Sequence, residues 1–137
     1  MSPREIREKL EACGVMPTPQ RMEVAEILLE KPQHMAADQI IDLLREGGRK
    51  VSKATVYNTL NLFSERGLIR ELSVDTSRKF YDSTTHPHHH FFNVDSGELQ
   101  DIPDDQIHIA GLPPLPAGTE RESVEVLIRV RGRKVVS

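Results

Sequence analysis

Five of the six histidines of this chain fall where they could bind a metal ion, and four of them stand within five residues. Neutral imidazole is the commonest side-chain ligand for transition metals in proteins. The run ends in two phenylalanines, which predicts a loop entering a strand. Alternation along that strand would send His88 and His90 to one side and His89 to the other. The run is T-T-H-P-H-H-H-F-F, and its histidines are His86, His88, His89 and His90.

Carboxylates flank the histidine run at Asp82 and Asp101. Two imidazoles with two carboxylates suit a borderline or hard divalent ion better than a soft one. The alternative is a solvated histidine-rich turn or part of a purification tag, although tags usually sit at a terminus. The residue types therefore predict a metal site.

Composition limits the size of the core and the class of protein. The 137 residues allow one ordinary domain or two small ones, and 37% hydrophobic with 4% aromatic residues make the core thin. No apolar run approaches the ~20 residues of a membrane span, so no membrane partner is expected. The one cysteine, Cys13, excludes an internal disulfide and makes a cytoplasmic location the expectation.

Charge is spread unevenly along the chain. Residues 1–85 hold 13 basic and 13 acidic side chains, whereas residues 86–137 hold 5 and 8, which gives the net charge of −3. A nucleic-acid-binding protein usually shows a basic footprint, and here the footprint is only local. We therefore expect any DNA binding to depend strongly on geometry. The local basic cluster is Arg45, Arg49, Lys50 and Lys53.

The first half predicts four helices followed by a hairpin. Capping residues or apolar periodicity place the helix starts near Ser2, Thr18, Ala36 and Ser52. Residues 68–74 and 78–82 read as two strands around the turn 75–77. This is the order of a winged helix-turn-helix, which a simple helical bundle does not explain.

In that layout the helix beginning at Ser52 enters the DNA major groove. Its apolar face is turned inward, so the polar side chains near its start face outward and could contact phosphates or base edges. For each of these, an ordinary exposed residue is the alternative. We add Arg21 from the second helix and Arg78 from the wing to this set. The predicted DNA-binding residues are then Arg21, Lys53, Thr55, Tyr57, Asn58, Asn61 and Arg78.

The second half predicts short strands. Residues 91–94 and 98–102 flank a hairpin turn, residues 106–109 could form another strand, and residues 123–130 alternate like a half-buried strand. The proline-rich segment 111–118 must be irregular. A sheet this small has exposed edges and little core, so dimerisation is the natural completion. The fold class is α+β, a winged-helix DNA-binding domain (residues 1–83) before a β-rich metal-binding and dimerisation domain (residues 84–137).

Two segments resemble the ferric uptake regulator superfamily. S-K-A-T-V-Y-N-T-L-N-L-F-S-E-R-G-L-I is similar to its recognition helix, and H-P-H-H-H-F-F-N-V-D-S-G-E-L to its metal-binding hinge and first dimerisation hairpin. The segment P-T-P-Q-R matches the start of its second helix. The resemblance covers roughly residues 4–131. Three consecutive histidines, the D-I-P and the L-P-x-x-P-x-G make the chain look most like the iron response regulator branch, which implies haem-dependent control.

The resemblance also implies two ligand sets. The sensing site of the family falls on His34, Asp82, His88, His90 and Asp101. A second site, or a haem site, would use His89, His108 and Glu125, although the family's last-strand histidine is absent. The haem hypothesis places His89 on the iron, with the neighbouring phenylalanines against the porphyrin.

Three departures from the family pattern limit what the resemblance implies. Asn93 and Ser96 replace the usual C-x-x-C pair, which excludes a four-cysteine zinc site. Asn58 stands where many members have arginine, and Cys13 lacks the following proline of a haem regulatory motif. Prolines in residues 113–116 interrupt the usual dimerisation helix.

These observations predict a homodimeric, operator-binding transcriptional regulator that responds to a divalent metal (Fe, Mn or Zn), to haem, or to both, and controls iron and haem genes. The alternatives are a sensor of another metal or of peroxide, and a metal-buffering protein. An enzyme is disfavoured, because five candidate ligands leave little open coordination and no nucleophile motif appears.

Overall fold

The computed structural model describes residues 1–74 and 79–133. The chain divides into two compact units, Met1–Thr85 and His86–Ser137. The predicted domain boundary, between residues 83 and 84, lies two residues earlier. Within the described residues, no helix is both long enough and apolar enough to cross a membrane.

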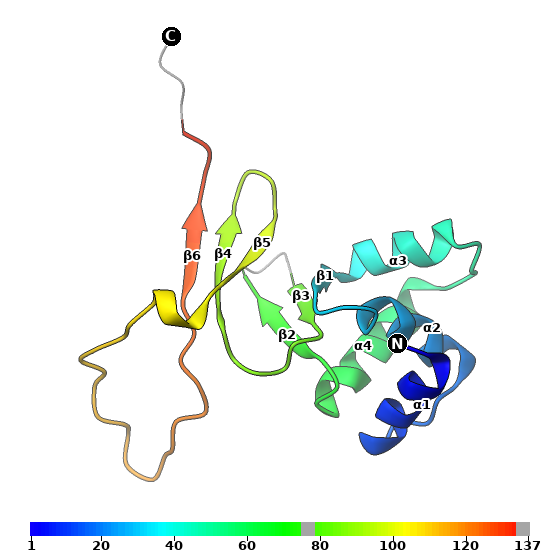
Figure 1. Cartoon of the computed structure of the whole chain (residues 1–137), viewed down its shortest axis with the longest axis horizontal. Coiled ribbons are helices and arrows are strands. Elements are labelled where there is room, and N and C mark those ends of the chain that lie inside the picture. Colours follow the sequence, from blue (N-terminus) through cyan, green and yellow to red (C-terminus); the bar gives the residue numbers. More distant parts are fainter. Residues whose placement is uncertain (75–78, 134–137) are drawn as a thin grey trace. The chain divides into compact units, whose positions relative to one another are not determined.

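Four helices form most of the first unit, as the sequence predicted (Figure 1): α1 (Pro3–Ala12), α2 (Pro19–Leu28), α3 (Ala37–Glu46) and α4 (Lys53–Glu65). The side-chain oxygens of Ser2, Thr18 and Ser52 accept backbone N–H groups of the first turns of α1, α2 and α4. At α3, the Gln39 side chain accepts the N–H of Ala36 instead. These bonds satisfy donors that a helix start leaves without intrahelical partners.

The four helices bury their apolar faces against one another in a single cluster. The predicted inward residues of α4, Val56, Leu60 and Phe63, are fully buried. Consequently, the opposite side of α4 is left to face outward. The other helices contribute Ile6, Leu10, Val24, Ala25, Leu28, Ile40, Ile41 and Leu44.

A three-stranded sheet follows the helices, in the order β1-β3-β2. The predicted wing strands are β2 (Arg70–Ser73) and β3 (Lys79–Asp82); the predicted turn at 75–77 and Arg78 lie outside the described residues. The prediction missed β1 (His34–Ala36), which lies just ahead of the helix that was predicted to start near Ala36. Three residues are too few to show alternation, so only the pairing with β3 reveals this strand.

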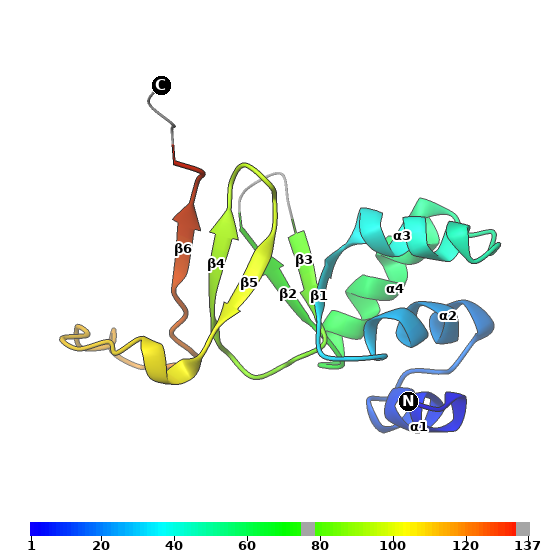
Figure 2. The same ribbon diagram turned by 45° about the horizontal axis from the view of Figure 1, so that its top comes forward.

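The second unit contains a second three-stranded sheet, in the order β5-β4-β6 (Figure 2). The strands β4 (His89–Asn93) and β5 (Leu99–Ile102) form the predicted hairpin, and β6 (Leu127–Val130) runs parallel to β4. The predicted strand at 106–109 is wrong, because the chain forms a 3-10 turn at Asp104–Gln106 and is then irregular. The proline-rich segment has no helix, as expected.

The last strand is shorter than the predicted 123–130, and its burial does not alternate. The alternation of residues 123–130 predicts Ile128 on the apolar side of the strand and Leu127 on the other, but Leu127 is half-buried and Ile128 is exposed. Among the described residues β6 pairs with β4 alone and so forms an edge of the sheet.

The second unit has little core of its own. Its buried hydrophobic side chains are Phe92, Leu99 and Ile102, among the residues that the structure describes. Ile109, Leu112 and Ile128 are exposed instead. A unit of this size needs further burial, a bound ion or an associated chain to be stable.

The contrast between two leucines tests the core of the first unit. Leu60 is fully buried on α4, whereas Leu43 on α3 is 41% exposed. Leu60→Ala should lower the free energy of unfolding by about 2–5 kcal/mol, because it leaves a cavity. Leu43→Ala, the control, should change it by less than about 0.5 kcal/mol. Denaturant unfolding measures both values, and equal small losses would contradict this packing.

Candidate functional site

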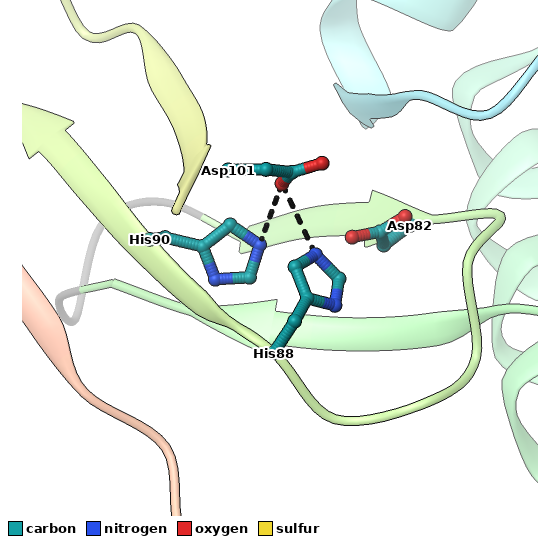
Figure 3. A group of neighbouring side chains, drawn as sticks. All are labelled: Asp82, His88, His90 and Asp101. Carbon is teal, nitrogen blue, oxygen red and sulfur yellow. Dashed lines mark hydrogen bonds and ion pairs between the residues drawn. The ribbon is translucent and has the colours of Figure 1, made fainter. Parts of the chain in front are cut away.

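Three candidate ligands of the second unit converge on one point (Figure 3). Asp101 Oδ1 lies 3.1 Å from His88 Nε2 and 3.1 Å from His90 Nε2. The hairpin register produces this arrangement, because His90 on β4 is paired directly with Asp101 on β5. His88 stands just before β4, two residues from His90 and so on the same side of the chain.

The tautomer of His88 decides how its ring can interact with the Asp101 carboxylate. His88 Nδ1 lies 3.0 Å from the carbonyl oxygen of His86, and a carbonyl can only accept, so Nδ1 carries the proton. In the neutral ring, Nε2 then directs a lone pair at the Asp101 carboxylate. Two acceptors facing each other at 3.1 Å need a cation between them, either a proton or a metal ion.

The surroundings of these three groups fit a metal ion. The side chains of His88 and His90 are 6% and 5% exposed, whereas that of Asp101 is 58% exposed, so the site has an open side. The three ligand atoms lie within 4.8 Å of one another. Neighbouring ligands at right angles, each about 2.1 Å from one ion, stand about 3 Å apart, as they do here. A backbone carbonyl that orients a ligating histidine is also usual in metal sites.

The first unit holds the other two predicted ligands on paired strands, and of these Asp82 belongs to the group of side chains drawn in Figure 3, whereas His34 does not. His34 on β1 is paired in register with Asp82 on β3. Asp82 is buried, and its Oδ1 accepts the backbone N–H of Thr84, which fixes the rotation of the carboxylate. Arg70 on β2 is paired with Asp82 on the other side. The prediction did not include Arg70, because only the strand register, and no sequence motif, places it beside an acid.

His89 takes part in holding the sheet together. Its Nδ1 accepts the backbone N–H of Val126 at 2.8 Å, and the adjacent N–H of His90 donates to the Val126 carbonyl. A backbone N–H can only donate, so Nδ1 of His89 is unprotonated and the neutral ring carries its proton on Nε2. Neither nitrogen then has a lone pair to offer to iron while this bond persists.

The other residues of the predicted second site form no metal-ligand group with His89 among the described residues. His108 is exposed in an irregular segment, and Glu125 is exposed ahead of β6. The described residues hold no second group of three ligand side chains like the one in Figure 3, which draws Asp82, His88, His90 and Asp101.

The predicted DNA-reading side chains lie on the outward side of α4. Lys53, Tyr57, Asn58 and Asn61 are exposed. Thr55 is half-buried, and its hydroxyl lies 2.8 Å from that of Ser52, within the helix cap. Arg78, the predicted wing contact, lies outside the described residues.

A polar hollow joins α4 to the start of α2. Arg21 lines it, and the Arg21 guanidinium donates to the carbonyl oxygen of Met16 at 3.0 Å, which holds the side chain in place. Polar side chains form most of its lining. The residues around it are Thr18, Gln20, Arg21, Thr55, Asn58, Thr59 and Leu62.

An ion pair holds the two strands of the wing together. Lys79 Nζ lies 2.9 Å from Glu71 Oε1, and this hydrogen bond, together with the charge of Glu71, raises the pKa of Lys79. Burial raises the pKa of the neighbouring Tyr81 hydroxyl. The positive charge of Lys79 is therefore partly balanced before any phosphate approaches.

A winged helix-turn-helix unit followed by a histidine- and aspartate-rich site defines a class of protein, the metal-responsive transcriptional regulators. The family model of the ferric uptake regulator family matches residues 12–111. The chain belongs to this family, which confirms the resemblance drawn from its sequence. Members of the family are regulators and not enzymes, so that prediction is also confirmed, and they bind DNA as dimers.

Two curated relatives are named as regulators of the peroxide response. The chain is 36% identical over 105 residues to the peroxide operon regulator of Bacillus subtilis, covering 74% of this chain and 72% of that protein. It is 33% identical over 93 residues to the peroxide-responsive repressor PerR of Staphylococcus aureus (strain USA300), covering 68% of this chain and 63% of the repressor.

Solved structures confirm the α+β fold. The ferric uptake regulator of Pseudomonas aeruginosa with manganese matches with a TM-score of 0.70 at 24% identity, over 93% of this chain and 98% of that chain. The Vibrio cholerae ferric uptake regulator matches with a TM-score of 0.72 at 21% identity, over 92% and 98%. None of these relatives is described as an iron response regulator, so that branch remains a prediction.

Paired variants distinguish the predicted ligands from the histidine between them. The double variant His88→Ala, His90→Ala should lose its bound divalent ion, because two of the converging ligand atoms are removed. His89→Ala should keep full stoichiometry, although it loses the bond to Val126. Metal analysis after equilibration with Mn²⁺ and gel filtration measures both. Full metal content in the double variant would refute the site.

Proposed function

We propose that this protein is a homodimeric, operator-binding repressor whose DNA affinity is set by one divalent ion. The ion would be bound by His88, His90 and Asp101 of the second unit, together with His34 and Asp82 of the first. The supporting observation is that the buried imidazoles of His88 and His90 both direct Nε2 at one carboxylate oxygen of Asp101, an arrangement that suits a divalent ion between them.

Ligands from both units would make the ion a clamp on their relative orientation. Only five residues of chain, 83–87, separate Asp82 from His88, a reach of at most about 20 Å, so the two ligand groups are tethered closely enough to share an ion. A ligand that binds one orientation better than another shifts the population towards it. Metal occupancy would thereby bias the dimer towards the arrangement that fits its operator.

The donor set supports a borderline or hard ion such as manganese, iron or zinc. It contains imidazole and carboxylate groups, and the single cysteine, Cys13, lies at the C-terminal cap of α1 in the first unit and is not part of the group. The proposed site therefore contains no thiolate ligand that would favour a soft ion.

A response to peroxide is the second candidate, and it is the one that the names of the curated relatives favour. Ferrous iron bound to imidazoles and carboxylates reacts with peroxide, whereas manganese in the same ligands reacts far less readily. Peroxide should release operator DNA from the iron-loaded protein and leave the manganese-loaded protein bound. Equal behaviour of the two forms in an anaerobic binding assay would remove this candidate.

The haem response predicted from the sequence has less support. The proposed axial ligand, His89, accepts a backbone hydrogen bond that leaves no ring lone pair for iron, and the named relatives respond to peroxide. Haem binding by His89 would require this part of the β4–β6 pairing to break. Control of iron and haem genes accordingly remains a prediction from resemblance.

DNA reading by α4 can be tested with single substitutions. Tyr57→Ala and Asn58→Ala should each weaken operator binding about 5- to 150-fold, because a good base contact contributes about 1–3 kcal/mol of discrimination. Metal stoichiometry should stay unchanged. Gln100→Ala, an exposed position on β5, is the control.

Fluorescence anisotropy with a labelled operator, titrated with and without Mn²⁺, measures these affinities. Wild-type affinity in both α4 variants would contradict DNA reading by this helix. Metal-independent operator binding by the wild-type protein would contradict the proposed function itself.

A further inference from the structure

A pair of residues next to the predicted ligands ties β1 to β3. Gln33 precedes His34, and Ser83 follows Asp82. The backbone N–H of Gln33 donates to Ser83 Oγ at 3.0 Å, and the backbone N–H of Ser83 donates to the Gln33 carbonyl oxygen at 3.0 Å. These two bonds extend the pairing of β1 and β3 by one position beyond the ligands.

The Ser83 hydroxyl has further partners on the same turn. Its oxygen lies 3.2 Å from the Gln33 carbonyl and 3.3 Å from that of Lys31, so its proton can be donated to either. The hydroxyl is thus used as both acceptor and donor. It fixes the turn between α2 and β1 against the end of β3.

The side chain of Gln33 reaches from this point to α2. Its Nε2 donates to the carbonyl oxygens of Ile27 at 2.6 Å and Leu28 at 3.3 Å. These carbonyls belong to the last turn of the helix, where intrahelical donors are missing, so Gln33 caps the C-terminus of α2. A shift of β1 would therefore also shift the C-terminal end of α2.

The other end of α2 carries the DNA-facing hollow. Gln20 and Arg21, in its first turn, line the hollow together with Thr55 and Asn58 of α4. A helix of ten residues is about 15 Å long and moves as a rigid rod. Continuous contacts therefore lead from the His34–Asp82 pair to the surface that would meet an operator.

We infer that Gln33 is a positioning residue that couples metal occupancy at His34 and Asp82 to the DNA-facing end of α2. This inference rests on the proposed function. Gln33 touches neither metal nor DNA in this role; it transmits the position of one strand pair to one helix. Physical contact alone does not establish coupling, so the decisive quantity is an interaction energy between the two binding events.

The test compares operator affinity with and without Mn²⁺ in matched variants. Couplings between binding sites are typically about 5- to 150-fold. The measured quantity is the ratio of operator affinity with Mn²⁺ to operator affinity without it. We expect this ratio to fall at least about 5-fold in Gln33→Ala and in Gln33→Glu, or to unity where the wild-type ratio is itself smaller than about 5. Gln33→Glu is similar in shape to the wild type but has no amide donor. Both should keep the metal stoichiometry and the Co²⁺ absorption spectrum of the wild type. Ser83→Ala should act in the same direction, and Ser83→Thr, which keeps the hydroxyl, should restore the ratio.

Gln39→Ala is the matched control. Gln39 also caps a helix through its side chain, but it caps the start of α3. Its loss should lower the thermal midpoint to a similar extent while leaving the affinity ratio unchanged.

The outcomes separate this inference from the proposed function. A wild-type protein with no metal-dependent affinity would overturn both. A metal-dependent wild type with an unchanged ratio in the Gln33 variants, or an equal loss of the ratio in Gln39→Ala, would overturn the inference alone.

Discussion

The convergence of His88, His90 and Asp101 on one point is the interaction on which the proposed metal site depends. His88 is fixed by a backbone carbonyl so that its free lone pair meets the Asp101 carboxylate, and His90 directs Nε2 at the same oxygen. When His88 is neutral, its Nε2 lone pair and the Asp101 carboxylate are both acceptors and repel each other unless a cation lies between them. The β4–β5 register creates this situation, because it sets an aspartate opposite a histidine on one face of the sheet.

The two units differ in how they are stabilised. The first has a continuous hydrophobic core shared by four helices, so it can hold a recognition helix in a fixed shape. The second has three buried hydrophobic side chains among the residues described, and its sheet has two edges. A unit with so little burial responds strongly to a bound ion or an associated chain, as a sensing element requires.

Much of the fold could be predicted from sequence because its signals are local. Caps such as Ser2 and Thr18 mark helix starts, and apolar periodicity marks buried faces. Strand β1 could not be predicted, since three residues carry no period. The burial of β6 was predicted wrongly because Leu127 and Ile128 lie on an edge strand, whose covering is decided by partners. The candidate ligands were visible as residue types, whereas the role of His89 depends on a contact with a strand 37 residues away.

The most direct test of the central claim is X-ray absorption spectroscopy of the protein loaded with one equivalent of Mn²⁺. We expect a first shell of nitrogen and oxygen only, with the outer-shell scattering of at least two imidazoles, which is lost in the His88→Ala, His90→Ala variant. A sulfur-containing shell, or a shell without imidazole scattering, would contradict the claim that these side chains bind the ion.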